Sequence, residues 1–415
     1  MKISQYLLGD KSIWGIVVLL SIFSFLPVYS ASSNLVYVVG SGSVFGHLLK
    51  HVAIVCVGWV IMYAVHLIPF KYFSGLAKLG IPVVVVLLLF TAFQGTTIDG
   101  ANASRWLNIP VIGMSFQTST LAMVVLLAYA ADYFANKKED KIRFTESLLP
   151  FWIPVLLVVG LILPANLSTA LLILFMVTVV AFLGGYPLKY LTALLGAAVL
   201  FLTLFILLAK AYPDAFPNRV DTWMSRVESF TGKGDDNTDY QIERAKAAVA
   251  VGGYVGIGAG KSMMKNVLPQ STSDFIYAII AEEYGMLGAI SLLFLFMLLL
   301  FRILINANKS ESFFGKLLIL AMGLPIVTQA FINMGVAVAL LPVTGQPLPL
   351  ISSGGTSLWM TFLALGVVLS VSANQPTTVN DNMSNPLAEL KEAIKVLSTS
   401  EDKRCLFPAR TLFLK

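Results

Sequence analysis

Three acidic residues lie where the chain changes from polar to apolar, in the stretch LPQSTSDFIYAIIAEEYGMLG at residues 268–288. Asp274 stands at this boundary, and Glu282 and Glu283 follow it by about two turns of a helix. A carboxylate at a membrane surface could act as a general base on a substrate that carries a lipid tail. Carboxylates inside an apolar span are costly and usually functional, so Glu282 and Glu283 are candidate supporting acids.

The same stretch allows a purely structural interpretation. Ser271, Thr272, Ser273 and Asp274 are all residue types favoured at helix N-termini, where a side-chain oxygen accepts a hydrogen bond from an unpaired backbone N–H. Spacing alone favours a helix cap over a general base. The residues by themselves leave both interpretations open.

A glycine-rich segment precedes these acids, with the sequence GGYVGIGAGKSMMKN at residues 252–266. It comes close to the phosphate-binding pattern G-x-x-x-x-G-K-S, but Val255 stands where that pattern needs glycine. One interpretation is a tightly turned loop without a ligand. The other is a backbone nest that, with Lys261 and Lys265, binds an anionic group such as a pyrophosphate. The two interpretations have equal support.

A second polar segment, DGANASRWLNIP at residues 99–110, places Arg105 beside Trp106. Tryptophan at a membrane interface is usually a belt residue. An arginine next to it could instead bind a phosphate through its forked guanidinium. Arg105 and Trp106 are therefore candidate substrate-binding residues.

The segment LLPVTGQPLPLISSGGTSLW at residues 340–359 contains three prolines and three glycines between two apolar runs. Irregular backbone at membrane depth is tolerated where it is buried in protein or lines a wet cavity. We therefore expect a cavity wall here, with Ser352 and Ser353 as substrate-binding residues. No spacing of histidine and cysteine predicts a metal site, and we interpret His47, His51 and His66 as packing or interface residues.

The elements that must position these residues are membrane-spanning helices. Of the 415 residues, 57% are hydrophobic and only 12% are charged, about half of the charged fraction of a soluble domain. Continuous apolar runs of about 20 residues predict helices that cross a bilayer. We predict an all-α polytopic membrane protein with about ten spans, near residues 13–30, 47–68, 76–95, 117–135, 148–164, 168–186, 188–209, 276–303, 315–341 and 355–373.

The distribution of basic residues predicts the orientation of the chain. With both termini in the cytoplasm, only Arg105 lies in a short outer loop, whereas the N-terminus and the short inner connections hold Lys2, Lys11, Lys71, Lys78, Lys137, Lys138, Lys141, Arg143, Lys189, Arg302, Lys309 and Lys316. This asymmetry follows the positive-inside rule and predicts a multi-pass protein of the cytoplasmic (inner) membrane. It also explains the net charge of +6 as a topology signal, so nucleic acid is not an expected partner.

The chain divides into a transmembrane domain at residues 1–374 and a cytoplasmic tail at 375–415, which we expect to be partly flexible. The largest connection, at about residues 210–275, separates the seventh and eighth spans and lies on the outer side. Within it, DYQIERAKAAVAVGG predicts a short amphipathic helix that ends at glycines. All of the candidate residues above then lie toward the outer face.

Several of these stretches occur in the order typical of one family. The chain resembles the SEDS family of bacterial cell-wall proteins, whose known members are FtsW and RodA. The matching stretches lie between residues 100 and 371 and are GANASRW, SFQTS, LSTALLI, DYQIERAKAAVAVGGYVGIGAGKS, LPQSTSDFIYAIIAEEYGMLG and INMGVAVALLPVTGQPLPLISSGGTSL. The overall pattern and the long tail favour the FtsW-like, septal branch over the RodA-like, elongation branch.

The resemblance implies a peptidoglycan glycosyltransferase that polymerises lipid II and releases undecaprenyl pyrophosphate. Asp274 matches the family's catalytic aspartate, expected to take the proton from the acceptor's GlcNAc 4-hydroxyl. Arg105 and Trp106 match the family's R-W pair, and Gln241 matches its Y-Q. The implied partners are a class B penicillin-binding protein and other division or elongation proteins, and the implied metal is Mg²⁺ or Mn²⁺. The pyrophosphate role of Lys261 and Lys265 is our inference from the glycine-rich segment.

Four neutral residues depart from the family pattern. Thr120 and Met123 replace an acid and a base that lie three residues apart on one helix face, Asn166 replaces an acid, and Thr272 replaces a histidine. The alternative function is a lipid II flippase, which would use a polar cavity without chemistry. Transport predicts a route open to the cytoplasm and internal repeats, whereas the polar residues here concentrate at the outer face.

Overall fold

The computed structural model describes residues 7–37, 40, 43–94, 106–109, 114–137, 142–211, 236–268 and 270–375. Within these residues nine helices are long and apolar enough to cross a membrane, and Leu167–Leu183 is a shorter apolar helix at the place of the sixth predicted span. The prediction of an all-α polytopic protein with about ten spans is therefore confirmed. The predicted tail at residues 375–415 lies outside the described residues, apart from Gln375.

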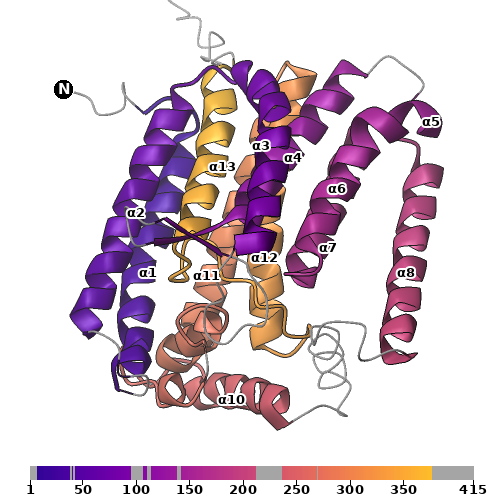
Figure 1. Cartoon of the computed structure of the whole chain (residues 1–415). Helices are drawn as coiled ribbons and strands as arrows, with labels where there is room; N and C mark the ends of the chain where they lie inside the picture. The colour runs from indigo at the N-terminus through magenta and orange to yellow at the C-terminus, as the bar shows by residue number, and fades with distance from the viewer. Residues whose placement is uncertain are drawn as a thin grey trace, which may run out of the picture. The chain divides into compact units, whose positions relative to one another are not determined.

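The elements follow one another along the chain as drawn in Figure 1. They are α1 (Lys11–Tyr37), α2 (Val44–His66), α3 (Tyr72–Gln94), β1 (Trp106–Ile109), β2 (Met114–Gln117), α4 (Thr118–Asn136), α5 (Phe144–Ser147), the π-helical η2 (Leu148–Trp152), α6 (Ile153–Ile162), α7 (Leu167–Leu183), α8 (Leu188–Ala211), α10 (Asp236–Gly252), the 3-10 helix η4 (Met264–Asn266), α11 (Ile276–Lys309), α12 (Phe313–Ala337) and α13 (Thr356–Ala373).

Helix α12 lies in the core, because it packs against α4, α7, α11 and α13. Helix α2 packs closely along α13, and glycine permits this approach: a Cβ on Gly58 would lie 2.1 Å from the ring of Phe362, and one on Gly366 would lie 2.9 Å from Val65. Small residues at helix contacts let backbones approach closely in membranes, where packing replaces the hydrophobic driving force.

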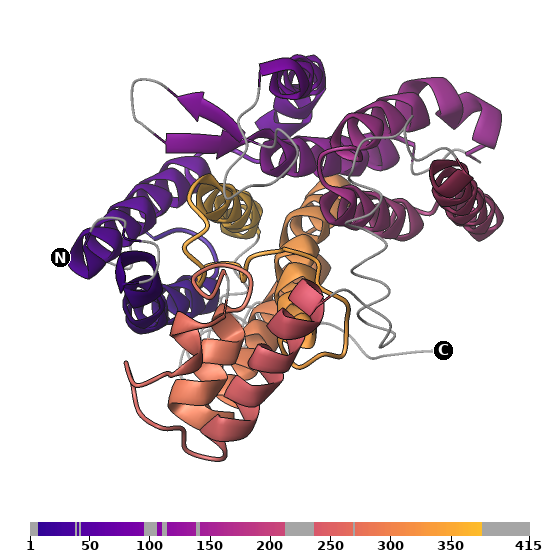
Figure 2. The same ribbon diagram turned by 60° about the horizontal axis from the view of Figure 1, so that its bottom comes forward.

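A short antiparallel hairpin was not predicted from the sequence. Strands β1 and β2 pair in the register Trp106↔Gln117 to Ile109↔Met114, and Figure 2 shows the hairpin beside the helices. Each strand has only four residues, too few for an alternating pattern to be recognised. The hydroxyl of Thr356, the first residue of α13, bonds to both Gln117 N (3.1 Å) and Ser115 O (3.2 Å), and so fixes β2 against α13.

The predicted amphipathic helix of the long outer connection is present as α10, which ends at Gly252 and Gly253 and packs against α11 (Figure 2). The apolar face of α10 explains this contact, since Ala245 and Ala248 are buried while Glu243 and Lys246 are exposed. The sidedness of the chain stays a prediction from its charge distribution.

A polar cluster joins three helices at the end of the bundle opposite to α10. Asp10 accepts hydrogen bonds from Arg302 Nε (2.9 Å) and from Asn306 Nδ2 (2.6 Å), and Ser372 on α13 donates to Asn306 Oδ1 (2.8 Å). Burial raises the pKa of Asp10. The hydrogen bonds that it accepts from Asn306, Arg302 and Ser12, together with the positive charge of Arg302, lower the pKa by more than burial raises it. The pKa of Asp10 is therefore below its ordinary value.

We expect Arg302→Ala to lower the free energy of unfolding by about 2–4 kcal/mol, because it leaves the carboxylate of Asp10 buried without its charged partner. Asp10 holds its proton less readily in the folded protein than in the unfolded chain. The ionised carboxylate therefore stabilises the fold above its ordinary pKa of 3.8, and this stabilisation is lost as the pH falls through the lowered pKa of the folded protein. Thermal unfolding in detergent between pH 3 and pH 7 measures both effects. A melting temperature equal to that of the wild type at pH 7 would contradict this assignment.

Candidate active site

Asp274 lies in a turn directly before α11. Helix α11 begins at Ile276 with Phe275 as its N-cap residue, and the side chain of Phe275 makes no capping hydrogen bond. The turn is instead closed by Ser273 N (3.0 Å) and Asp274 N (3.1 Å), which donate to the carbonyl of Gln270. Asp274 therefore lies one position before the N-cap residue of α11 and not at it.

A cavity of about 490 Å³ opens beside this turn. Its walls come from α1, α2, the hairpin β1–β2, α4, α12, α13, the turn at residues 270–274 and the proline-rich loop between α12 and α13. Asp274 is the only acid among the described residues that line it. The polar and basic residues that line it are Ser32, His47, Lys50, His51, Trp106, Ser115, Gln117, Thr120, Asn166, Gln270, Thr272, Ser273, Gln329, Gln346, Ser352, Ser353, Ser357 and Thr361.

The structure brings four predicted site residues to this one cavity. Asp274, Trp106, Ser352 and Ser353 all line it, although Trp106 is more than 160 positions before Asp274 in the sequence. Arg105, which was predicted to bind substrate with Trp106, lies outside the described residues. The predicted cavity wall at residues 340–359 is confirmed, since Gly345 to Gly355 contribute most of their residues to the lining.

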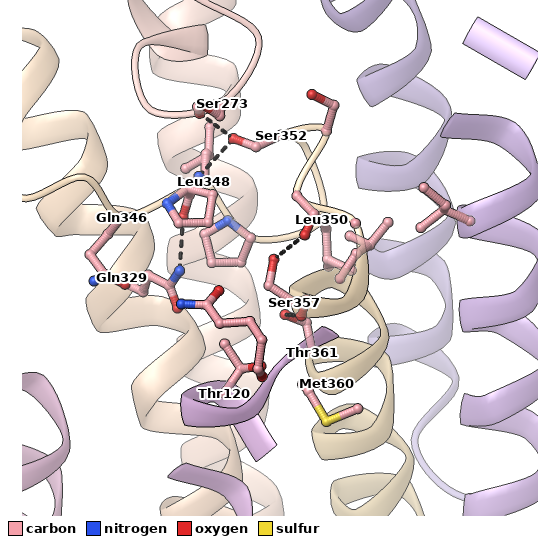
Figure 3. A pocket seen from close by; sticks show the side chains of 18 of the residues that line it. Thr120, Ser273, Gln329, Gln346, Leu348, Leu350, Ser352, Ser357, Met360 and Thr361 are labelled. Atoms are coloured by element: carbon pink, nitrogen blue, oxygen red, sulfur yellow. Dashed lines mark hydrogen bonds between the residues drawn. The ribbon is translucent and has the colours of Figure 1, made fainter. Parts of the chain in front are cut away.

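The hydroxyls of Ser352 and Ser353 bind the backbone of the turn that carries Asp274. Ser352 Oγ donates to Ser273 O (2.6 Å) and accepts from Leu348 N (2.8 Å), as the dashed lines of Figure 3 show. Ser353 donates from both N (3.1 Å) and Oγ (3.0 Å) to Thr272 O. The single hydrogen of each hydroxyl is thus used by the turn that carries Asp274, so these serines hold that turn rather than donate to a substrate.

Three further predicted substrate-binding residues do not line this cavity. Gln241 is half-buried on α10, and Lys261 is exposed in the glycine-rich loop. Lys265 Nζ donates to Gly260 O (2.7 Å) and to Ser30 Oγ (3.3 Å). The ammonium of Lys265 therefore holds its own loop against α1.

Glu282 and Glu283 are completely buried and do not reach the cavity either. Glu282 accepts hydrogen bonds from Met263 N (2.9 Å), Met264 N (3.3 Å) and the hydroxyl of Ser262. Glu283 accepts from the hydroxyl of Ser30 and from Ser262 N (3.3 Å). The two acids support the site only indirectly, by fixing residues 262–264 between α1 and α11.

The glycine-rich loop pairs with a break in α11. At Gly285 the backbone leaves the helical conformation (φ 65°, ψ −163°), which exposes the carbonyls of Glu282 and Glu283 to the loop. These carbonyls accept from Ile257 N (3.1 Å) and Gly258 N (3.0 Å). Since these two N–H groups are used within the protein, the geometry favours the tightly turned loop over a nest that binds anions.

Three basic residues of α2 were not predicted as site residues. His47, Lys50 and His51 lie one turn apart on one face of the helix, and all three line the cavity. The interpretation of His47 and His51 as packing or interface residues was therefore incomplete, although His51 is buried and its Nε2 lies 3.0 Å from Ser24 Oγ. The sequence signal for this face was Lys50, because an ionisable residue within a predicted apolar span, here 47–68, is a functional candidate.

The four residues that depart from the family pattern all line the cavity: Thr120, Met123, Asn166 and Thr272. Their shared location agrees with the expectation that Thr120 and Met123 face the same side of α4. Asn166 is also the N-cap of α7, where its side chain accepts from Thr169 N (3.2 Å). The cavity wall therefore carries no charge at these four positions: Thr120, Asn166 and Thr272 are polar, and Met123 is apolar.

A divalent cation, which the resemblance implies, would find few side-chain ligands in this cavity. Among the described residues no three His, Cys, Asp or Glu side chains are grouped closely enough to hold a metal ion. The lining of the cavity offers one carboxylate, that of Asp274, so a bound Mg²⁺ would need phosphate oxygens of the substrate as further ligands.

Known proteins resemble this chain over most of its length. The family model FTSW_RODA_SPOVE, described as a cell cycle protein, matches residues 10–377. The "Probable peptidoglycan glycosyltransferase FtsW" of Enterococcus hirae is 30% identical over 383 residues, which cover 88% of this chain and 92% of that protein. The protein of the same name from Bacillus subtilis is 30% identical over 385 residues, which cover 91% and 94%.

Solved structures share the fold. One chain, from a study described as "Structural coordination of polymerization and crosslinking by a peptidoglycan synthase complex", superimposes with a TM-score of 0.70 at 26% identity, covering 89% of this chain and 99% of the other. The rod shape determining protein RodA of Thermus thermophilus superimposes with a TM-score of 0.63 at 25% identity, covering 89% and 98%.

Proposed function

The chain belongs to the FTSW_RODA_SPOVE family of cell cycle proteins, and on this premise we propose that it is a peptidoglycan glycosyltransferase that polymerises lipid II for the septal wall. It acts as a multi-pass protein at the outer face of the cytoplasmic membrane. The observation that carries the proposal is the position of Asp274: it is the one acid among the described residues lining the cavity, and it is not the N-cap residue of α11.

Asp274 acts as the general base of this reaction. Its carboxylate takes the proton of the acceptor's GlcNAc 4-hydroxyl while that oxygen bonds to the anomeric carbon of the donor. The bond from the anomeric carbon to the pyrophosphate oxygen breaks, and undecaprenyl pyrophosphate leaves with the electron pair. The proton stays on Asp274 until solvent removes it.

The leaving pyrophosphate is bound at the face of α2 that carries Lys50 and His47. Negative charge develops on it in the transition state, and a cation held at that position lowers the barrier. Lys50 supplies such a cation in the cavity, whereas Lys261 and Lys265 lie outside it. We therefore move the pyrophosphate role, assigned to Lys261 and Lys265 from sequence, to Lys50, and retain Trp106 and Arg105 as candidate substrate contacts.

We expect Lys50→Ala to raise the KM for lipid II about tenfold and to lower kcat by a similar factor, because the cation contacts the pyrophosphate before and during its departure. Lys50→Arg should retain most of the activity. Lys261→Ala, which removes an exposed cation outside the cavity, is the matched control and should leave both constants within about twofold. A stronger effect of Lys261→Ala than of Lys50→Ala would show that the glycine-rich loop, and not α2, binds the pyrophosphate.

The flippase alternative is less well supported by the extent of the cavity. In α2, α4 and α13 the lining residues occupy 47–54, 120–127 and 357–364, which end near the middle of each helix, and in α12 they occupy 321–329, around its middle. A transporter needs a route that opens to both sides. The cavity suits a reaction on one face of the membrane.

The solved neighbour from a peptidoglycan synthase complex supports a partner for crosslinking. We propose that this partner is a class B penicillin-binding protein, with other division proteins in the same assembly. The tail after Gln375 would then be available for such contacts in the cytoplasm. Mg²⁺ or Mn²⁺ remains a proposal that follows from the resemblance.

The proposed function is tested by incubating the purified chain with fluorescent lipid II, alone and with its penicillin-binding protein inactivated by penicillin. Glycan strands resolved by gel electrophoresis are the expected product. The same preparation is reconstituted into vesicles to follow transfer of lipid II between leaflets. Transfer between leaflets without polymer, under conditions in which the complex is intact, would establish the flippase instead.

A further inference from the structure

Three successive carbonyls around Asp274 accept hydrogen bonds from α12 and the loop that follows it. Thr272 O is bound by Ser353, and Ser273 O is bound by Ser352. The carbonyl of Asp274 itself is bound by Asn333, whose Nδ2 lies 2.8 Å from it. A different part of the chain therefore fixes the backbone of the turn, in addition to the local bonds from Ser273 N and Asp274 N to Gln270 O.

Asn333 is the member of this set that joins two loops. Its amide nitrogen donates both hydrogens to backbone carbonyls, one to Asp274 O (2.8 Å) and one to Gln346 O (2.8 Å). Because both neighbours are acceptors, the nitrogen must occupy this position and the amide cannot be reversed. Asn333 is 1% exposed and does not line the cavity.

The hydrogen bonds continue from Asn333 to the far wall of the cavity. The side chain of Gln346 donates to Thr169 Oγ1 (2.9 Å), and Thr169 N donates to Asn166 Oδ1 (3.2 Å). Gln346 and Asn166 both line the cavity. Through these hydrogen bonds Asn333 connects the backbone of Asp274 to Gln346 and Asn166, which a substrate in the cavity would contact.

The carbonyl oxygen of the Asn333 side chain destabilises the fold. Its Oδ1 is buried and has no hydrogen-bond partner among the described residues. A buried acceptor without a partner is rare in folded proteins and calls for an explanation. An apolar residue would avoid the cost, but it could not hold Asp274 and Gln346 at once.

We propose that Asn333 is a positioning residue for Asp274. It fixes the backbone of the general base so that the carboxylate meets the acceptor hydroxyl, and it does so without touching the substrate. This inference rests on the proposed function of the same cavity. Since a displacement of about 1 Å can cost about a hundredfold in rate, loss of Asn333 should lower kcat and leave lipid II binding intact.

The test compares steady-state polymerisation of lipid II by the full chain with its penicillin-binding protein, for the wild type, Asn333→Ala and Asn333→Ser. The serine variant keeps a small polar group but is too short to reach both carbonyls. For both variants we expect kcat to fall about 10–100-fold, with the KM for lipid II within about twofold of the wild type.

Asn306→Ala is the matched control for loss of a buried asparagine. Asn306 is 3% exposed, and its amide also donates to two acceptors, Asp10 Oδ2 (2.6 Å) and Arg302 O (2.7 Å), at the opposite end of the bundle. We expect it to lower the melting temperature as Asn333→Ala does, but to change kcat by less than twofold. Equal losses of kcat in Asn306→Ala and Asn333→Ala would overturn the proposal, as would a rise in KM at unchanged kcat.

A double mutant of Asp274 and Asn333 distinguishes failure of the positioning role of Asn333 from failure of the proposed function. Once Asp274 is replaced by asparagine, Asn333→Ala should lower the residual rate no further, because the group that it positions is gone. A full additional loss in that background would make Asn333 a general structural residue. If the wild type itself forms no polymer, the proposed function fails; if the wild type forms polymer and the Asn333 variants match it, only the present inference fails.

Discussion

Asp274→Asn is expected to lower kcat for lipid II polymerisation by about 10²–10⁴-fold, because asparagine cannot take the proton of the acceptor hydroxyl. The substitution keeps the shape of the side chain and leaves the backbone bonds of Asp274 N to Gln270 and of Asp274 O to Asn333 in place. Lipid II binding and the melting temperature should therefore stay close to those of the wild type. Polymer yield, a lipid II binding curve and thermal unfolding, measured on one preparation, check the three parts of this expectation.

Asp132→Asn supplies the matched control for loss of an acid. Asp132 is buried on α4, where it pairs with Lys78 Nζ (2.9 Å) and accepts from Ser74 Oγ (2.5 Å), and it does not line the cavity. We expect this variant to be less stable but to retain its kcat, the reverse of the pattern for Asp274→Asn. Equal polymer from wild type and Asp274→Asn would remove the general base and favour the flippase.

Gly256→Ala is expected to lower the free energy of unfolding by about 3 kcal/mol or more. Gly256 has a φ of +86°, and a Cβ there would lie 2.2 Å from Glu283 O and 2.6 Å from Gly285 N. Both are backbone atoms, so neither can swing away as a flexible side chain could. The loop would have to separate from α11 at the break, which removes the hydrogen bonds from Ile257 and Gly258 to α11.

Gly260→Ala is the control that measures the effect of backbone strain on stability without the close contact. Gly260 also has a positive φ, +77°, but a Cβ added there would meet no atom within 4 Å, so only the left-handed conformation, about 1–2 kcal/mol, opposes the substitution. Thermal unfolding should therefore rank wild type, Gly260→Ala and Gly256→Ala in that order of decreasing stability. A folded Gly256→Ala protein with weakened lipid II binding would instead support an anion-binding nest.

The sequence alone determined the membrane-spanning helices and the place of Asp274 among them. Apolar runs of bilayer length predict helices because each residue of such a run must satisfy its backbone bonds locally, so nearly all spans could be located without tertiary information. The amphipathic α10 was predictable from the periodicity of its apolar residues, and its end was predictable from the glycines that follow. The hairpin β1–β2 was not, since its strands are too short to carry a pattern.

Only the tertiary structure decided what each candidate side chain contacts. Ser352 looked like a substrate contact, but its hydroxyl binds Ser273, 79 positions away in the chain. Glu282 looked like part of the reaction site, and it binds the backbone of Met263 and Met264 instead. Lys50 was not predicted as a site residue, and the fold placed it among the residues that line the cavity. Hydropathy is a property of neighbours in sequence, whereas a hydrogen bond forms with whichever partner folding brings within about 3 Å, and those partners come from distant helices.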